Sequence, residues 1–464
     1  MRPGVELAGK RVLVVGLART GIATALFCAA RGARVTAAEE RVETELGESA
    51  QKLRAAGVNI VCGAHSPALF LEQDLIVPSP GVPAQLPALV QARSKEVTVW
   101  SEIELAWRFL RGRLIAITGS NGKTTTTALL GHILETAGMP VLVGGNIGTP
   151  LIALVENSSD SSVTVAEASS FQLELIAAFR PDVGVILNIT PDHLDRHGSL
   201  EEYGRAKGRI FENQVERDAA VLNADDAAVS ALLPSRPQIF WFSRQKRVAA
   251  GTYLRDGQIV FRRDGLETPL LREGEIPLRG SHNVENVLAA ALAASLVGAE
   301  PRAVAEGVRT FAGVEHRLEF VAAINGVNYF NDSKATNVDA TLKAIDAFSG
   351  LLIVILGGKD KGSPYTPLRE PLREHKAKVL LIGAAAEKIA AQLGGCVPVE
   401  HAGTLERAVE RAFEQARAGD TVLLAPACAS FDQFQNYEHR GRVFKQLVGA
   451  VNTKSAAREA APKG

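Results

Sequence analysis

Runs of aliphatic residues typical of buried strands alternate with helical stretches along most of the chain. Residues 11–16 (RVLVVG) predict a strand that ends in a glycine turn, an apolar helical stretch follows to Ala30, and residues 33–38 predict a second strand. The same order of strand, glycine-rich loop and helix returns at residues 113–118, and buried-strand runs recur later, for example at residues 351–356. Strands that alternate with helices are typical of parallel, doubly wound sheets. The pattern therefore predicts the α/β class.

The composition narrows the classes of function. Lys+Arg and Asp+Glu number 51 each, so the net charge is zero and gives no support to a nucleic-acid or membrane-surface partner. The four cysteines are scattered without a CxxC pair, so neither a disulfide framework nor a cysteine zinc site is expected. The longest uncharged stretch, residues 136–155, contains four Gly and two Pro and is a poor membrane span. We expect a cytoplasmic protein.

The first glycine loop, residues 16–21 (GLARTG), approaches the dinucleotide fingerprint GxGxxG, with Ala18 at the middle glycine. That glycine lets the backbone approach a pyrophosphate, so a methyl group there weakens the case for NAD. The N-terminus of the following helix still favours an anion. Glu39, at the end of the second strand, could accept hydrogen bonds from a ribose. A structural turn between strand and helix is the alternative.

A second glycine loop, residues 119–125 (GSNGKTT), follows one predicted strand and precedes a long helix. It departs from the strict P-loop pattern GxxxxGK[ST], which would have Gly where Ile117 stands. Small residues in this context can surround a phosphate with N–H groups. Lys123 would reach the terminal phosphates and Thr124 would offer its hydroxyl to Mg²⁺. The alternative is a glycine-rich turn with a solvated lysine, but strand, loop and helix together favour a nucleotide site.

Polar clusters follow several other predicted strands. Glu167 and His193 each come after an apolar strand, and open α/β sheets bind ligands at the carboxyl ends of their strands. A carboxylate suits Mg²⁺, whereas imidazole is a less usual ligand. Residues 331–337 (NDSKATN) and 357–361 (GGKDK) bring lysines to strand ends, which suits an anionic small molecule. Solvated loops are the alternative, and the sequence alone leaves Lys207 a solvated helix lysine.

We expect three α/β domains from these patterns and from a length of 464 residues. The first, residues 1–98, and the third, residues 315–464, are expected to be Rossmann-like. The central domain, residues 99–314, is expected to be of the P-loop ATPase type with a parallel sheet. A disordered tail is expected from about residue 452.

These motifs in this order resemble the muramoyl peptide ligases, the ATP-dependent amide-forming enzymes of peptidoglycan synthesis. The resemblance covers nearly the whole chain and rests on TGSNGKTT (118–125), GGNIGTP (144–150), EASSFQLE (167–174), TPDHLDRH (190–197), YGRAK (203–207), SHNVEN (281–286), HRLE (316–319), NDSKATN (331–337) and PACASFDQFQNYEHRG (426–441). It implies ligation of D-glutamate to UDP-N-acetylmuramoyl-L-alanine through an acyl phosphate, with ATP and two Mg²⁺ ions. We expect no nucleic-acid or membrane partner. The sequence leaves the oligomeric state open and favours a monomer.

The resemblance also implies which residues bind each substrate. The expected UDP-substrate residues are Gly16, Leu17, Ala18, Arg19, Thr20, Gly21, Glu39, Arg41, Ser79, Pro80, Gly81 and Asn146. The expected ATP residues are Gly119, Ser120, Asn121, Gly122, Lys123, Thr124, Thr125, Asn283, Asn286, Arg317, Asp332 and Lys334. D-glutamate is expected at Thr336, Lys361, Ser430 and Tyr437. Two of these segments depart from the family: Glu-Glu-Arg stands at 39–41 in place of Asp-Thr-Arg, and the family often has Phe where Tyr437 stands.

The expected catalytic residues are Lys123, His193 and Lys207. The resemblance implies that Thr124 and Glu167 serve one Mg²⁺ ion, and that His193 with Lys207 serves the other. Lys207 matches the lysine that the family carries as a carbamate, in which CO₂ turns the amine into a carboxylate-like ligand.

Three other interpretations compete with this one. A folylpolyglutamate-type or another muramoyl ligase keeps the fold and changes the substrate, but the UDP-type first domain and the NYEHRG motif argue against these. An NAD-dependent oxidoreductase would be built on residues 16–21, against which Ala18 and the second glycine loop count. A nucleotide-switched binding protein would not be expected to carry the loops at 331–337 and 357–361.

Overall fold

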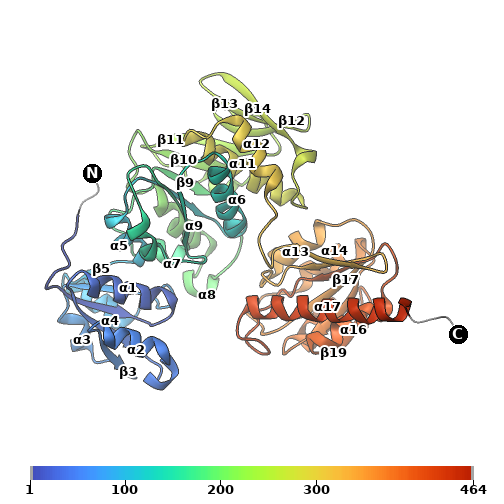
Figure 1. Ribbon diagram of the computed structural model, residues 1–464, viewed down its shortest axis with the longest axis horizontal. Helices are drawn as coiled ribbons and strands as arrows, with labels where there is room; N and C mark the ends of the chain where they lie inside the picture. The colour runs from blue at the N-terminus through green and yellow to red at the C-terminus, as the bar shows by residue number, and fades with distance from the viewer. Residues whose placement is uncertain (1–3, 461–464) are drawn as a thin grey trace. The chain divides into compact units, whose positions relative to one another are not determined.

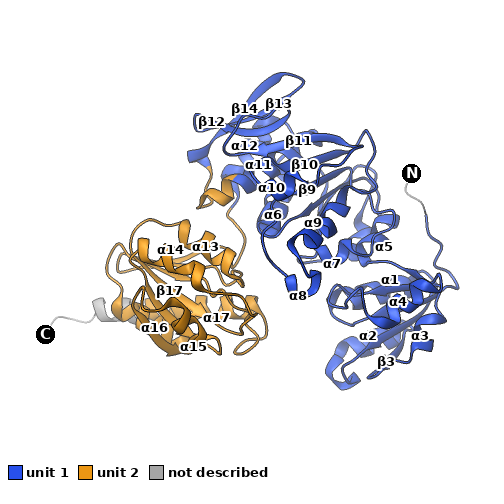
Figure 2. Ribbon diagram, turned by 180° about the vertical axis from the view of Figure 1, so that it is seen from behind, with its two compact units in different colours: residues 1–275, 285–311 blue, residues 276–284, 312–464 orange. Residues whose placement is uncertain are grey.

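The computed structural model describes residues 4–460, without the side chains of Asp195 and residues 454–460. The chain forms two compact units (Figures 1 and 2). Unit 1 consists of residues 1–275 and 285–311, and unit 2 of residues 276–284 and 312–464. Unit 1 contains two sheets and unit 2 contains a third, which confirms the predicted α/β class.

The first sheet has five parallel strands in the order β3-β2-β1-β4-β5. Val12–Val15 are all buried, because helices cover the sheet and a strand covered on both faces is apolar throughout. The strands are β1 (Arg11–Val15), β2 (Arg34–Glu39), β3 (Asn59–Cys62), β4 (Leu75–Pro78) and β5 (Thr98–Val99). The helices are α1 (Arg19–Ala30), η1 (Glu43–Leu46), α2 (Glu48–Ala55), α3 (Pro67–Leu71) and α4 (Pro87–Ser94).

The second sheet has nine strands in the order β14-β13-β12-β11-β10-β9-β6-β8-β7. The strand that precedes the second glycine loop, β6, lies between β8 and β9. The strands are β6 (Arg113–Thr118), β7 (Val141–Gly145), β8 (Val163–Glu167), β9 (Val183–Ile186), β10 (Ala219–Asn223), β11 (Gln238–Ser243), β12 (Gly251–Arg255), β13 (Gln258–Arg263) and β14 (Leu266–Arg272).

The helices of this part of unit 1 precede, connect or follow those strands in the chain. They are α5 (Glu102–Phe109), α6 (Lys123–Thr136), η2 (Leu151–Asn157), α7 (Ser170–Leu173), α8 (Leu194–His197), α9 (Leu200–Gly208), η3 (Arg209–Phe211), α10 (Ala227–Ser230), η4 (Glu273–Glu275), α11 (Ser281–Leu296) and α12 (Pro301–Thr310). The first four residues of α11 belong to unit 2.

The parallel sheet predicted for this region needs one correction. The strands from β7 to β12 pair in parallel, but β13 is antiparallel to both β12 and β14. Two-residue turns, Asp256-Gly257 and Asp264-Gly265, join these strands, with positive φ at all four positions. Asp-Gly is a strong hairpin signal, because a type I′ turn requires positive φ at both central residues. The second sheet is therefore mixed.

The third sheet, in unit 2, has six strands in the order β15-β16-β20-β17-β18-β19, with β15 antiparallel and the rest parallel. Along β17, Ile353 and Ile355 belong to one buried cluster and Val354 and Leu356 to the other, so helices cover both faces (Figure 1). The strands are β15 (Glu319–Ile324), β16 (Val327–Asn331), β17 (Leu352–Gly357), β18 (Lys378–Ile382), β19 (Val399–Gly403) and β20 (Thr421–Leu424). The helices are α13 (Val338–Asp346), η5 (Thr366–Leu368), α14 (Arg369–Glu374), α15 (Ala386–Leu393), α16 (Leu405–Gln415) and α17 (Tyr437–Ala460).

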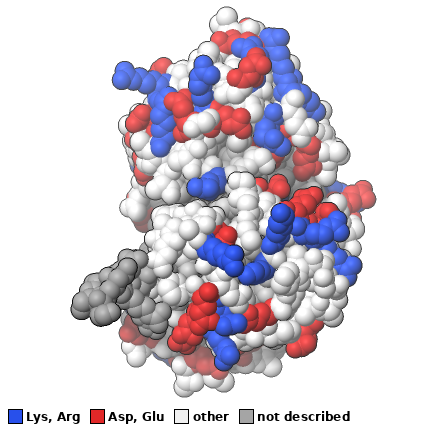
Figure 3. Space-filling view, turned by 90° about the vertical axis from the view of Figure 1, so that its right-hand side faces the viewer, with Lys and Arg blue, Asp and Glu red and all other residues white. Residues whose placement is uncertain are grey.

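The end of the chain differs from the disordered tail expected from about residue 452. Helix α17 continues to Ala460, and residues 461–464 lie outside the described range. The sequence AAREAA is rich in strong helix formers, which accounts for the extension. Among the helices of residues 4–460, none is long and apolar enough to cross a membrane. The face drawn in Figure 3 shows basic and acidic side chains interspersed, in keeping with the zero net charge.

Candidate active site

The loop between β6 and α6 has the geometry of an anion-binding helix start. Gly122 is the N-cap residue of α6 in a left-handed conformation (φ 83°), and no side chain caps the helix. A Cβ atom at this position would lie 2.3 Å from Oδ1 of Asn286, so both the conformation and the close approach require glycine. The N–H groups and the dipole at such a helix start favour an anion. The local structure therefore agrees with the predicted nucleotide loop.

Lys123 folds back over the loop that precedes it. Its Nζ donates to the carbonyl oxygens of Gly119 and Ser120, at 2.8 Å each. The ammonium group thus lies beside the start of α6, where a bound phosphate would provide a stronger, charged acceptor than the two carbonyls. This position suits the predicted contact of Lys123 with the terminal phosphates.

Glu167, at the end of β8, lies buried beside the same loop. One carboxylate oxygen accepts from the hydroxyl of Thr124 at 2.9 Å, and the other accepts from the side-chain amide of Asn146 at 3.0 Å. The structure therefore brings together three residues predicted from segments far apart in the sequence. A buried carboxylate beside a threonine hydroxyl is a donor set of hard oxygen atoms, which Mg²⁺ prefers.

Lys207 is buried rather than solvated, which corrects the interpretation drawn from its charged helix alone. It is 1% exposed, its Nζ donates to the carbonyl of Gly119 at 2.8 Å, and the ammonium lies 4.4 Å from the ring centroid of Tyr203. Burial, and then the positive charge of Lys123, lower the pKa of Lys207 well below its usual value, while Asp192 and Glu167 partly oppose this. The environment favours the neutral amine.

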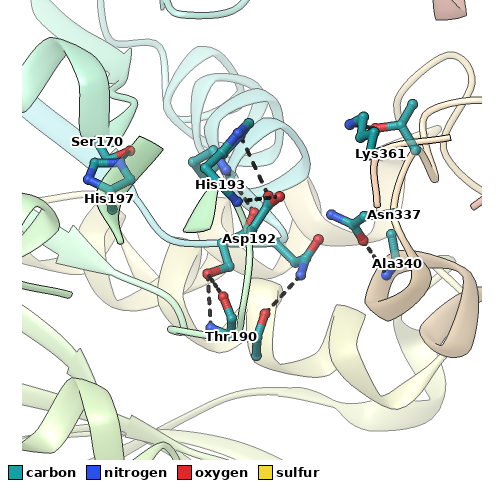
Figure 4. Close-up of polar contacts among 12 residues, drawn as sticks. Ser170, Thr190, Asp192, His193, His197, Asn337, Ala340 and Lys361 are labelled. Carbon is teal, nitrogen blue, oxygen red and sulfur yellow. Dashed lines mark hydrogen bonds and ion pairs between the residues drawn. The ribbon is translucent and has the colours of Figure 1, made fainter. Parts of the chain in front are cut away.

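His193 is the N-cap residue of the short helix α8 and has a left-handed conformation (φ 52°) that is uncommon for a residue other than glycine. Such conformations cluster at functional sites. Its Nε2 lies 3.7 Å from a carboxylate oxygen of Asp192, and its ring packs edge-on against Phe171 with centroids 4.9 Å apart. Figure 4 shows Asp192 and His193 in contact, with Ser170 and His197 paired nearby. The hydroxyl of Ser120 donates to the carbonyl of Thr190 at 2.9 Å, so this segment lies beside the second glycine loop.

The predicted UDP-substrate residues of the first sheet form one connected group. The carboxylate of Glu39 accepts from the N–H of Leu17 at 2.8 Å and from the guanidinium of Arg41 at 2.9 Å. The hydrogen bond from Arg41 is the main reason that the pKa of Glu39 falls to about 2. Ser79 donates from its hydroxyl to the carbonyl of Gly16 at 2.6 Å. The glycine turn and the ends of β2 and β4 therefore meet at one edge of the sheet.

Arg19 differs from the others in what it contacts. Its guanidinium donates to the carbonyl of Gly148 at 2.8 Å, in the loop that also carries Asn146. In this structure Arg19 therefore bridges the first glycine loop to the segment that orients Glu167.

The predicted nucleotide residues divide between the two units. Asn286, in unit 1, is buried beside the loop and accepts from the hydroxyl of Thr126 at 3.2 Å. Asn283 and Arg317 line a cavity of about 220 Å³ within unit 2. Arg317 forms an ion pair with the buried Asp332 at 3.7 Å, and burial raises the pKa of Asp332 despite this partner.

The predicted D-glutamate residues belong to three loops and the start of α17, which meet within unit 2. The Nζ of Lys361 donates to the hydroxyl of Thr336 at 3.4 Å, which joins the loops after β16 and β17 (Figure 4). A backbone bridge between Lys359 and Ala429 joins the loop after β17 to the loop after β20, where Ser430 is buried. The carbonyl of Tyr437 accepts from the hydroxyl of Ser333 at 2.8 Å.

Sequence reasoning missed two residues that hold predicted substrate loops in place, one in each unit. Arg440 is fully buried and donates to the hydroxyl and carbonyl of Ser333 and to the carbonyl of Cys428. Arg196 contacts the segment after β4 and helps to line a cavity of about 1330 Å³ that also includes His193 and Gly81. Both stand inside the quoted motifs EHRG and DHLDRH, and that placement was the available signal.

Three family descriptions match three successive parts of the chain. The family description "Mur ligase MurD-like, N-terminal domain" matches residues 10–101, "Mur ligase middle domain" matches residues 117–294, and "Mur ligase, glutamate ligase domain" matches residues 316–428. The chain belongs to the Mur ligase family, whose members are ATP-dependent enzymes that form an amide bond.

The most similar relatives include two proteins with one name. The UDP-N-acetylmuramoylalanine--D-glutamate ligase of Koribacter versatilis is 53% identical over 445 residues, which cover 96% of this chain and 98% of that protein. The protein of the same name from Acidobacterium capsulatum is 55% identical, over 96% of this chain and 97% of that protein. Among solved structures, the UDP-N-acetylmuramate-alanine ligase of Thermotoga maritima has a TM-score of 0.59 at 19% identity, covers 95% of this chain and 100% of its own, and supports the fold.

Proposed function

We propose that this chain joins the amine of D-glutamate to the carboxylate of UDP-N-acetylmuramoyl-L-alanine at the expense of ATP, a step of peptidoglycan synthesis. The observation that carries the proposal is the similarity, over nearly the full length of both chains, to relatives that bear the name of this activity. The second glycine loop, with Lys123 and the buried Glu167 beside it, supports it independently.

The chemistry requires an activated acid, because a carboxylate is a poor electrophile. The γ-phosphoryl group of ATP is transferred to the alanine carboxylate, which gives an acyl phosphate and ADP. The start of α6 and the ammonium of Lys123 stabilise charge on the transferred group, which is a matter of positioning and electrostatics. The remaining ATP contacts are assigned to the predicted residues of the 119–125 loop and to Asn283, Asn286, Arg317, Asp332 and Lys334.

The side chains around Glu167 fit Mg²⁺. The hydroxyl of Thr124 and the carboxylate of Glu167 are 2.9 Å apart and supply oxygen ligands for one ion. A bound Mg²⁺ would neutralise charge on the phosphate oxygens. We assign a second ion to His193 and Lys207.

Lys207 fits the second ion only after modification, since an ammonium group is no metal ligand. Its burial and the nearby charge of Lys123 favour the neutral amine. That amine can attack CO₂, forming an N–C bond and releasing one proton, and the resulting carbamate offers two oxygen atoms. The ammonium groups of Lys123 and Lys207 both donate to the carbonyl of Gly119, so two positive charges lie close together. Carbamate formation at Lys207 removes one of these positive charges.

The second half-reaction takes place at the acyl carbon. The deprotonated amine of D-glutamate attacks it, and phosphate leaves from the tetrahedral intermediate. We assign D-glutamate to Thr336, Lys361, Ser430 and Tyr437, and the UDP-substrate to the loops at 16–21 and 79–81 with Glu39, Arg41 and Asn146. His193 positions substrate and metal in this account.

Several expectations accompany the proposal. The domain bounds 1–98, 99–314 and 315–464, a monomeric state and a cytoplasmic location stay predictions.

ADP release tests the proposal most simply. The purified chain is incubated with Mg-ATP and UDP-N-acetylmuramoyl-L-alanine, with D-glutamate, and with both. We expect sustained ADP release and amide product only with both substrates. ADP release that is independent of both would favour a nucleotide switch, and a change in nicotinamide absorbance without ADP release would favour an oxidoreductase.

A further inference from the structure

The guanidinium group of Arg196 joins the two sheets of unit 1. It donates to the carbonyl of Pro80 at 3.0 Å and to the carbonyl of Val82 at 3.2 Å, both in the loop of residues 79–82 that follows β4. Arg196 itself belongs to α8, at the second sheet. Two N–H arms of one planar group therefore fix two carbonyls, two residues apart, in a loop more than a hundred residues away in the sequence.

The 79–82 loop is held on its other side by the first glycine turn. Ser79 donates from its hydroxyl to the carbonyl of Gly16 at 2.6 Å and from its N–H to the carbonyl of Val15 at 2.8 Å. A short turn closes the loop, with the N–H of Val82 donating to the carbonyl of Ser79 at 2.9 Å. The loop therefore lies between the glycine turn and Arg196.

The same guanidinium is also fixed on the side of the second sheet. It lies 3.8 Å from the ring centroid of Phe171 and 3.3 Å from a carboxylate oxygen of Glu174. Phe171 packs in turn against the ring of His193, three residues before Arg196 in the chain. Arg196 is 17% exposed, so its contacts are largely shielded from water. One side chain thus connects the 79–82 loop to His193 through a single aromatic ring.

We propose that Arg196 is a positioning residue that fixes the 79–82 loop relative to His193, so that the UDP-linked substrate presents its carboxylate at the second sheet. The proposal rests on the proposed function, because it concerns the binding of that same substrate. Arg196 acts through the loop and through Phe171, and it takes no part in the reaction itself. Arg196 and Gly81 of the 79–82 loop both line the cavity of about 1330 Å³, together with Phe171 and His193.

The arrangement needs arginine rather than any cation. Lysine carries a single compact ammonium group, which cannot donate to two carbonyls in a fixed fork while its plane stacks on a ring. R196K therefore keeps the positive charge and loses the planar fork of N–H donors. R196M removes both the charge and the fork, while its side chain keeps much of the packing of arginine.

The experiment compares R196M and R196K with wild type and with R205M. Arg205 lines the same cavity, but it is 59% exposed and its ion pairs are to Glu201 and Glu202 of its own helix. Two readouts are used. Steady-state kinetics give KM for each of the three substrates, and hydrogen exchange measured by mass spectrometry follows the peptide that covers residues 79–86.

We expect R196M to raise KM for the UDP-linked substrate by about tenfold, which corresponds to about 1.4 kcal/mol, while KM for ATP and for D-glutamate changes by less than about twofold. R196K is expected to raise the same KM by about threefold or more. Exchange in the 79–86 peptide is expected to be faster in both variants, and R205M is expected to match wild type in both readouts.

Unchanged exchange in the 79–86 peptide of R196M would overturn the proposal, and so would faster exchange with a wild-type KM for the UDP-linked substrate. If R196M does not fold, a wild-type KM in R196K overturns it equally. If wild type forms no amide product at all, the proposed function fails, whereas the exchange comparison still decides whether Arg196 fixes the loop.

Discussion

Replacing Glu102 by glutamine is expected to remove a pH dependence from the stability of unit 1. Glu102 opens α5, is 1% exposed, and accepts a hydrogen bond of 2.6 Å from the N–H of Ile152 in η2. Burial raises the pKa of this carboxyl from 4.5 to about 7, more than its hydrogen bonds lower it. The folded chain therefore holds a proton at Glu102 that the unfolded chain releases.

The size of the effect follows from that difference. A group whose pKa is raised by folding contributes stability below its unfolded pKa and loses it as the pH rises through its folded pKa. A change from 4.5 to about 7 corresponds to about 3 kcal/mol at about 1.4 kcal/mol per unit. Most of this, about 2.5 kcal/mol, falls between about pH 5 and about pH 8. E102Q keeps the shape of the neutral acid and does not titrate.

Urea unfolding followed by tryptophan fluorescence measures the effect, because Trp100, Trp107 and Trp241 all lie in unit 1. Groups that titrate in both proteins cancel in the difference between wild type and E102Q. We expect wild type to lose about 2.5 kcal/mol relative to E102Q as the pH rises from about 5 to about 8. Parallel curves, or a wild type that gains stability relative to E102Q, would refute the reasoning.

Three further predictions concern the site and its support. K207A is expected to abolish amide formation. Added formate or acetate is expected to restore part of the activity, because a small carboxylate can occupy the place of the carbamate. If these acids have no effect on the activity of K207A, the carbamate is ruled out. K123A is expected to abolish ADP release while its circular dichroism spectrum stays that of wild type, since the ammonium donates to two backbone carbonyls of its own loop, those of Gly119 and Ser120. Turnover at the normal rate would contradict this. E104A is expected to destabilise unit 1 by about 3 to 5 kcal/mol in urea unfolding. The carboxylate of Glu104 accepts from Arg108 and from three backbone N–H groups at 2.7 to 2.9 Å, and these four donors would lose their acceptor. A loss of stability below about 1 kcal/mol would contradict this prediction.

The features that the sequence predicted best are those formed by residues that are contiguous in the chain. The second glycine loop was predicted because strand, loop and helix are contiguous, and the structure places Gly122 and Lys123 as that pattern requires. The alternation of strands and helices likewise predicted three parallel α/β sheets. It missed the antiparallel pairing of β13 with β12 and β14, where charged residues and short strands obscure the alternation, and that of β15 with β16.

Burial was the property that the sequence alone could not supply. Lys207 stands in a helix rich in charge, yet the same face carries Tyr203 four residues earlier, and both are buried. Helical spacing of i and i+4 puts these two side chains on one face, which was the available signal. The sign of the pKa shift at Lys207 depends on that burial and on Lys123, which lies 84 residues away in the chain.

Contacts between segments far apart in the chain could not be predicted from the sequence either. The fork of Arg196 on the carbonyls of Pro80 and Val82 involves backbone atoms, which carry no signature in the sequence. The family resemblance located Ser79, Pro80 and Gly81 as substrate residues but gave no reason for the position of their loop. The structure supplies that reason through one side chain of the second sheet.

The central claim is that ATP activates the alanine carboxylate as an acyl phosphate before the amide forms. Its most direct test uses UDP-N-acetylmuramoyl-L-alanine labelled with ¹⁸O in both carboxylate oxygens, incubated with ATP, D-glutamate and the purified chain. The account predicts that one ¹⁸O atom appears in each inorganic phosphate released and that the other stays in the amide product. Phosphate free of ¹⁸O, formed together with the amide, would contradict it.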